Sequence, residues 1–251
     1  MSIKEEGIFG INFCFSLLLL PVQAIIAFFL WTQGLGPMQI GGFSANRMVL
    51  YYIFQNILMI TYQSALYVAY EVSNDISSGN IIVWLFRPIS YAKLKYAEKF
   101  GFFILRMAVG YLSFIIFSVI LKQNISIIQY FLSLACTIIG FTLLFQIQLL
   151  IGLLAFRLKN VLQLRDFVMD ILWILGGTLL PLDFFPVFLR DFLQYTVIPL
   201  VYYLPGKILL TQLSTVETWV IFASAISRIV VYSLLIKLLW RLDSMKANQG
   251  A

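Results

Sequence analysis

The stretch SNDISSGNIIVWLFRPISY, residues 73–91, interrupts an otherwise strongly apolar chain. It opens with residues typical of turns and helix caps, continues with the apolar run Ile81 to Phe86, and stops at Arg87-Pro88. Such a run is too short to cross a bilayer, because a spanning helix needs about 20 residues. The stretch therefore predicts a short helix outside the hydrocarbon region, between two membrane-spanning segments.

The ends and faces of this short helix can also be predicted. Ser77 or Ser78 is expected to cap it by accepting hydrogen bonds from its first backbone N–H groups. Ile81, Trp84 and Leu85 would share one face, which could fill a groove on another protein. Alternatively, the helix could lie on lipid with Trp84 as its anchor.

The composition is that of a polytopic α-helical membrane protein. The chain has 251 residues, of which 61% are hydrophobic and only 11% charged, whereas soluble domains are nearer one quarter charged. Its mean hydropathy is +0.94. The apolar runs are continuous and too long for the alternating strands of a β-barrel. We therefore expect an all-α fold in the membrane.

Six apolar segments predict six transmembrane helices in a single domain, residues 1–251. The segments cover residues 8–31, 48–70, 100–121, 127–156, 167–182 and 218–240. With both termini cytoplasmic, eleven Lys and Arg residues lie inside and four outside, which agrees with the positive-inside rule. The net charge of +6 is therefore attributed to cytoplasmic loops and not to nucleic-acid binding.

The longest external loop, residues 183–217, is too apolar for a solvated linker. Its Phe and Leu residues recur at helical spacing between Pro186 and Pro199, which favours a short re-entrant hairpin. A full span is disfavoured because Asp183 and Arg190 would then lie in hydrocarbon.

Motifs for catalysis and metal binding are missing. The sequence contains no phosphate-binding loop, no nucleophile elbow, no zinc-protease motif and no histidine. Cys14 and Cys136 both lie inside apolar runs, where thiols are usually inert. We expect no enzyme activity, no cofactor and no metal site in this chain.

Four polar residues of the second segment are spaced seven residues apart in pairs, so we expect them on one helix face: Gln55, Asn56, Tyr62 and Gln63. They could form hydrogen bonds between helices or line a substrate pathway, and both can hold in a dimer.

Arg106 and Arg228 lie within spans, where a charge costs about 3 kcal/mol at mid-bilayer, so each is expected to pair or to extend towards headgroups.

Taken together, the chain resembles permeases of the ABC-2 family, in the branch of daunorubicin-resistance-type and related bacterial multidrug permeases. DISSGNIIVWLFRPISY is similar to the family signature, an acidic residue, a glycine four positions later, an apolar run and Arg-Pro. FFLWTQGLG and GGFSANRMVLYYI resemble the end of its first span and the start of its second. LLPLDFFPVFLRDF, PLVYYLPGKILL and ANQGA resemble its last hairpin and tail.

The resemblance implies the membrane subunit of an exporter that moves a small or amphipathic substrate out of the cytoplasm. It would sit in the cell membrane as a dimer with an identical or homologous permease, and a separate ATPase subunit would bind ATP and Mg²⁺. The implied contacts with that ATPase subunit are Asp75, Gly79, Trp84, Arg87 and Pro88, and the implied external gate is Asp183, Phe184, Phe185 and Pro186.

Two expectations stay open. Family members often carry a longer amphipathic segment before the first span, whereas only residues 1–7 precede it here, so either the start lies upstream or that surface helix is missing. The alternative function is a helical channel or secondary transporter that needs no ATPase.

Overall fold

The computed structural model describes residues 19–33, 44–85, 90–158 and 160–249, and every regular element in these ranges is a helix. In chain order the elements are the helix Leu19–Gln33, α2 (Ala45–Leu66), α3 (Val68–Ser77), α4 (Ile82–Leu85), α5 (Tyr91–Ile120), α6 (Ile127–Leu153), η1 (Leu154–Phe156), α7 (Val161–Leu175), η2 (Leu182–Phe184), α8 (Val187–Leu193), α9 (Ile198–Val201), α10 (Tyr203–Leu210) and α11 (Thr215–Gln249). The all-α prediction is therefore confirmed for the described residues.

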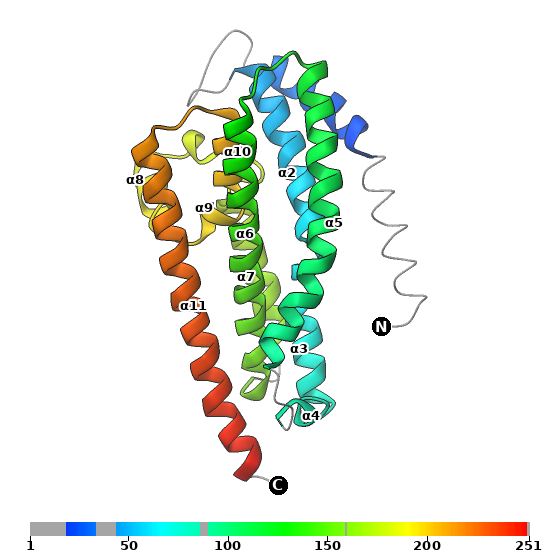
Figure 1. Ribbon diagram of the computed structural model, residues 1–251, viewed down its shortest axis with the longest axis vertical. Coiled ribbons are helices and arrows are strands. Elements are labelled where there is room, and N and C mark those ends of the chain that lie inside the picture. The colour runs from blue at the N-terminus through cyan, green and yellow to red at the C-terminus, as the bar shows by residue number, and fades with distance from the viewer. Residues whose placement is uncertain (1–18, 34–43, 86–89, 159, 250–251) are drawn as a thin grey trace.

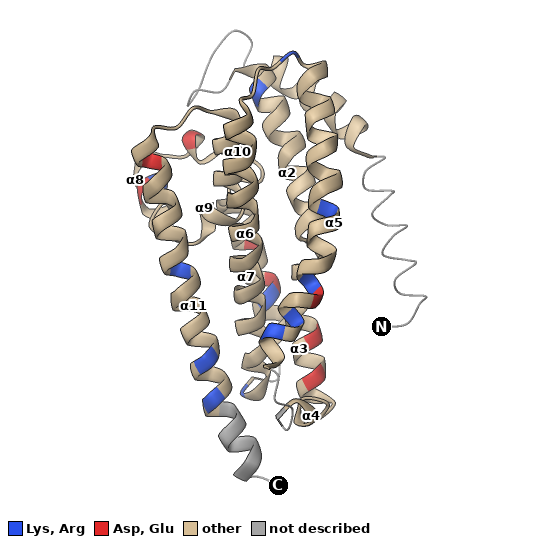
Figure 2. Cartoon of the chain, viewed as in Figure 1, with Lys and Arg blue, Asp and Glu red and all other residues tan. Residues whose placement is uncertain are grey.

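The long helices run along the longest axis of the molecule (Figure 1). The short helix α4 and the last turns of α11 lie at one end, which we call the α4 end. The α5–α6 connection and α8 lie towards the opposite end. Lys and Arg residues are concentrated in the half of the bundle near the α4 end (Figure 2).

Three described helices are long and apolar enough to cross a membrane, namely Tyr91–Ile120, Ile127–Phe156 and Thr215–Leu242. Helix α2 has 22 residues, or about 33 Å at 1.5 Å per residue, but its polar side chains make it less apolar than these three. Helix α7 and the Leu19–Gln33 helix are shorter. The six-span topology therefore stays a prediction.

The predicted segment boundaries agree best at 127–156, which coincides with α6 and η1, and worst at 167–182. Helix α7 ends at Leu175 because Gly177 has a φ of 82°, a left-handed conformation that glycine adopts readily and that ends a helix. Helix α5 starts at Tyr91 and not near residue 100. Part of the first predicted segment, residues 8–18, lies outside the described residues.

Helix α6 is the centre of the bundle, because it contacts α2, α3, α7, α9, α10 and α11. Several of its polar side chains bond other helices. Ser133 donates to the Pro205 carbonyl oxygen at 2.8 Å, and Gln146 Nε2 donates to Ser233 Oγ at 2.8 Å. Bonds of this kind hold helices together where the surroundings offer no water.

Close helix packing around α6 depends on Gly140. A Cβ atom at this position would lie 2.5 Å from the Tyr62 hydroxyl and 3.0 Å from the carbonyl oxygens of Leu200 and Val201. Helices α2, α6 and α9 therefore approach one another at a point where only glycine fits, as small residues allow in membrane helices.

The loop predicted as a hairpin forms four short helices, η2 and α8 to α10. Helix α8 lies between Pro186 and Pro199, as the apolar spacing predicts. Its apolar side chains differ in exposure: Leu193 is fully buried, whereas Phe188 and Phe192 are 75% and 66% exposed. Helix α10 packs on α6 and α2. The position of the hairpin relative to a membrane stays a prediction.

Candidate functional site

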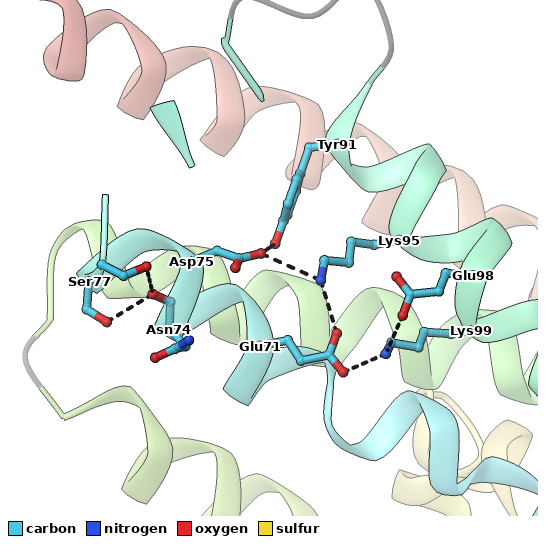
Figure 3. A network of polar contacts seen from close by, with 9 residues as sticks. Glu71, Asn74, Asp75, Ser77, Tyr91, Lys95, Glu98 and Lys99 are labelled. Carbon is cyan, nitrogen blue, oxygen red and sulfur yellow. Dashed lines mark hydrogen bonds and ion pairs between the residues drawn. The ribbon is translucent and has the colours of Figure 1, made fainter. Parts of the chain in front are cut away.

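An ion-pair network joins α3 to the first turns of α5, beside the short helix α4 (Figure 3). Glu71 lies between two lysines: its Oε1 is 2.5 Å from Lys99 Nζ and its Oε2 is 3.1 Å from Lys95 Nζ. Asp75 Oδ2 lies 3.5 Å from Lys95 Nζ and accepts a hydrogen bond of 2.7 Å from the Tyr91 hydroxyl. The two helices that flank α4 are thus tied together.

Most of this network was missed by the sequence reasoning. Glu71 and Asp75 are one turn apart on α3, and Tyr91, Lys95 and Lys99 follow at the same spacing on α5. Residues four apart lie on one helix face. The acidic pair before residues 76–90 and the basic pair after them could therefore have predicted ion pairs between the two helices. The Lys99 side chain is only 5% exposed, which makes its acidic partner essential.

Aromatic rings extend the network from α4 to α11. The Trp84 ring packs edge-on against Tyr91, with centroids 5.6 Å apart. Tyr91 also stacks on Trp240 of α11, with centroids 5.5 Å apart and ring planes 9° apart. A displacement of α4 would therefore reach α5 and α11 through direct contact.

The structure corrects the predicted cap. Ser77 and Ser78 do not cap a following helix; both hydroxyls donate back to the Asn74 carbonyl oxygen, at 3.2 and 2.7 Å. They close the end of α3, which continues through the residues that the sequence suggested were a turn. The chain reverses direction at Gly79, whose φ is 76°. Glycine adopts this left-handed conformation more readily than other residues. A Cβ there would meet no atom of the chain within 4 Å.

The predicted docking face of α4 is wrong for Ile81, which is 2% exposed and belongs to the core. Trp84 is half-buried and packs against Tyr91, and the Leu85 side chain lies outside the described residues. The apolar side chains that face outwards are Ile82 and Val83, at 52% and 55% exposed. The helix has a single turn, so its faces are set by how the loop folds back and not by helical spacing. Arg87 and Pro88 lie outside the described residues.

The four polar residues predicted to share one face of α2 divide into two pairs. Gln55 and Tyr62 are buried and bond other elements: Gln55 Nε2 donates to the Tyr202 carbonyl oxygen at 3.1 Å, and Tyr62 donates to that of Thr137 at 3.1 Å. Asn56 and Gln63 are half-buried. Adjacent residues lie about 100° apart on a helix, so Gln55 and Tyr62 lie on a different face from Asn56 and Gln63.

Beside α2, a cavity of about 240 Å³ lies against α7 and the residues that follow it. Its walls include Gln55 and Asn56 from α2, Trp173 from α7 and Thr178 beyond α7. Gln55 Oε1 and Thr178 Oγ1 are buried and form no hydrogen bond with the described residues. Buried polar atoms are normally bonded, so these two can bind a water or a polar ligand group.

The predicted gate residues lie in and beside η2. Asp183 accepts a hydrogen bond from Tyr203 at 2.5 Å and pairs with Lys207 at 3.1 Å. Burial, followed by the charge of Asp183, raises the pKa of Tyr203 well above its usual value, so this hydroxyl stays a donor. Phe184 contacts Trp31 of the Leu19–Gln33 helix. Phe185 is half-buried and Pro186 exposed.

Of the two arginines within spans, Arg106 is buried at 8% exposed. Arg228 is half-buried and bonds neutral oxygens, with Ser224 Oγ 3.0 Å and the Gln194 carbonyl oxygen 3.4 Å from its guanidinium nitrogens.

This arrangement of long apolar helices and short packed helices, with a braced turn at one end, is typical of a helical membrane transport protein. A family model described as ABC-2 family transporter protein matches residues 17–246. The chain belongs to the ABC-2 family of transporters and is a membrane permease of an ABC transporter. Such permeases work with an ABC ATPase subunit and are generally not catalytic themselves. No curated protein and no solved structure matches the chain.

Proposed function

We propose that the protein is the permease subunit of an exporter that moves a small or amphipathic substrate out of the cytoplasm. A separate nucleotide-binding subunit binds ATP and Mg²⁺ and hydrolyses the ATP. The observation that carries this proposal is the brace around α4, in which ion pairs join α3 to α5 and stacked rings join α4 to α11. A braced turn between α3 and the long helix α5 is suited to transmitting the motion of an attached ATPase.

Transmission would begin at the exposed residues Ile82 and Val83, which are available to a groove on the ATPase subunit. Because Trp84 packs on Tyr91, it serves less well as a lipid anchor than as a link to the rest of the chain. A push on α4 would move Tyr91, and with it Trp240 on α11 and the lysines of α5. Asp75 and Gly79 shape the turn that holds α4 in place.

The substrate pathway would run along the α2 face that carries Asn56 and Gln63, past the cavity between α2 and α7. The unbonded oxygens of Gln55 and Thr178 supply polar contacts there, and Trp173 supplies an apolar wall. Tyr62 belongs to the same helix but supports the packing of α6 through its bond to Thr137.

In the cell membrane, the α4 end would face the cytoplasm, where the ATPase subunit and both termini lie. The concentration of Lys and Arg in that half of the bundle supports this orientation (Figure 2). The residues Asp183 to Pro186 would then form part of an external gate. A second permease, identical or homologous, would complete the pathway.

Co-purification with the ATPase subunit tests the proposal. Ile82→Asp/Val83→Asp should abolish capture of a tagged ATPase subunit, because it places two charges in the apolar contact. The matched control is Ile127→Asp/Ile128→Asp, a pair that is 74% and 70% exposed at the start of α6, and it should retain capture. If both variants capture the ATPase subunit as well as the wild type does, α4 is excluded as the docking element. Substrate transport by the purified chain without any ATPase would favour a channel or secondary transporter instead.

A further inference from the structure

A cavity of about 680 Å³ separates the short helices α8 to α10 from the first half of α11. Its volume is within the usual range for small-molecule sites. It does not include the α2–α7 cavity, since the two share no lining residue. The pathway and the ATPase contact proposed above make no use of it, and the only proposed gate residue on its wall is Asp183.

The charges on the cavity wall do not balance. Lys207 is neutralised by Asp183, whose other oxygen accepts the Tyr203 hydrogen bond. Glu217 accepts from the Ser214 backbone N–H at 2.8 Å and caps the start of α11. The other charged residues on the wall are two arginines, Arg190 and Arg228, so three basic residues face two acidic ones and the wall has an excess of one positive charge.

Among the described residues, neither arginine pairs with a buried carboxylate. The ion pair of Arg190 there is with the neighbouring Asp191 at 3.6 Å, and both side chains are more than 40% exposed, so this pair is weak. Arg228 bonds two neutral oxygens, and within the described part of the chain no carboxylate pairs with it. It also lies inside the apolar segment Thr215–Leu242, where an ionised side chain demands a counter-charge or polar surroundings.

Most of the rest of the wall is apolar, beside the polar residues Gln194, Thr196 and Ser224, and exposed aromatic side chains lie next to it. Leu204, Val220 and Ile221 line the cavity. Tyr195, 79% exposed, stands at its edge, and Phe192 on α8 is 66% exposed. Exposed aromatic side chains of this kind favour the boundary between headgroups and acyl chains.

We propose that this cavity binds an amphiphile with a single anionic headgroup. The headgroup contacts Arg228 and Arg190, because a guanidinium provides several N–H donors suited to a phosphate or carboxylate. The apolar chain lies along Val220, Ile221 and Leu204. Two sources carry this chemistry: an anionic phospholipid of the surrounding membrane, and an anionic substrate of the transporter.

Native mass spectrometry of the full chain in dodecyl maltoside tests the binding, with phosphatidylglycerol and phosphatidylcholine of identical acyl chains as probes. One phosphatidylglycerol should bind more tightly than any phosphatidylcholine. Arg228→Gln should weaken that binding about ten-fold, the effect of losing one charged hydrogen bond. Lys237→Gln is the matched control, since Lys237 is exposed on the same helix but does not line the cavity, and it should leave binding unchanged.

A second pair of variants separates the cavity from a general charge effect. Val220→Trp fills the cavity without altering charge and should also weaken phosphatidylglycerol binding. Val230→Trp adds the same bulk at a position on α11 that is 52% exposed and outside the cavity, and it should have no effect. All variants should elute from a sizing column as the wild type does. The proposal is overturned if Arg228→Gln binds as tightly as wild type, or if phosphatidylcholine competes equally.

Transport then distinguishes the two sources. Labelled phosphatidylglycerol that changes leaflet only when ATP and the ATPase subunit are present is a substrate, whereas one that stays bound throughout is a resident lipid. The binding measurement uses the permease alone, so it can succeed or fail independently of the proposed exporter function.

Discussion

Replacing Glu71 by Gln should destabilise the α4 end by about 2–3 kcal/mol. The bond to Lys99, whose side chain is 5% exposed, takes the full value for a buried bond to a charged group, about 1.5–3 kcal/mol. The bond to Lys95 adds little, because both side chains are partly exposed, at 16% and 26%. Each lysine also keeps a second acid, Glu98 at 3.1 Å and Asp75 at 3.5 Å, which limits the loss.

A double-mutant cycle in mixed micelles of dodecyl maltoside and increasing sodium dodecyl sulfate measures this coupling. Glu71→Gln and Lys99→Met should each destabilise the fold, and the double variant should be more stable than the sum of the two losses predicts, by about 1.5 kcal/mol. Asp166→Asn is the control, because this acid pairs with Arg165 at 2.7 Å but is 63% exposed, so the change should stay below about 1 kcal/mol. Additive losses, within about 0.5 kcal/mol, would refute the idea of a coupled brace.

Three further outcomes are expected. In intact cells, a cysteine at Ser214 should react with an impermeant thiol reagent, whereas one at Ser77 should react only after permeabilisation; labelling of Ser77 from outside would overturn the orientation. The purified chain should hydrolyse ATP only after its ATPase subunit is added, and activity that persists through further purification of the chain alone would contradict this. Gly140→Ala should destabilise the fold by about 1–3 kcal/mol in the same micelle assay, because the new Cβ overlaps its neighbours. Gly101→Ala, in open space on α5, should be neutral or slightly stabilising, and equal effects would contradict the packing explanation.

The sequence was most informative where a single physical signal acts alone. The uninterrupted apolar run of 127–156 predicted α6 and η1 to the residue, because a long apolar segment without glycine pairs or charges has few alternatives to a helix. The signature around Asp75 and Gly79 correctly located the point at which the chain turns between α3 and α4. Pro186 directly precedes α8, as expected, whereas Pro199 lies in the first turn of α9.

The sequence was least informative where tertiary contacts decide the outcome. Ile81 was expected to face a partner, but the turn folds back and buries it in the core, while Trp84 is half-buried against Tyr91. The stack of Tyr91 on Trp240 joins residues far apart in the sequence, and no local pattern predicts it. Likewise, the spacing of Gln55 and Asn56 could not say that Gln55 bonds the Tyr202 carbonyl oxygen while Asn56 donates to the Tyr52 carbonyl oxygen of its own helix.

The brace has an electrostatic consequence for whatever approaches the α4 end. Glu71 and Asp75 form ion pairs with Lys95 and Lys99 of the same chain. Their negative charges are therefore not available to neutralise other basic residues. Lys93 on α5 and Lys237 on α11 are exposed in the same half of the bundle and leave a positive potential there. An acidic protein surface or an anionic headgroup is therefore attracted from a distance, and its rate of association falls as added salt shortens the Debye length.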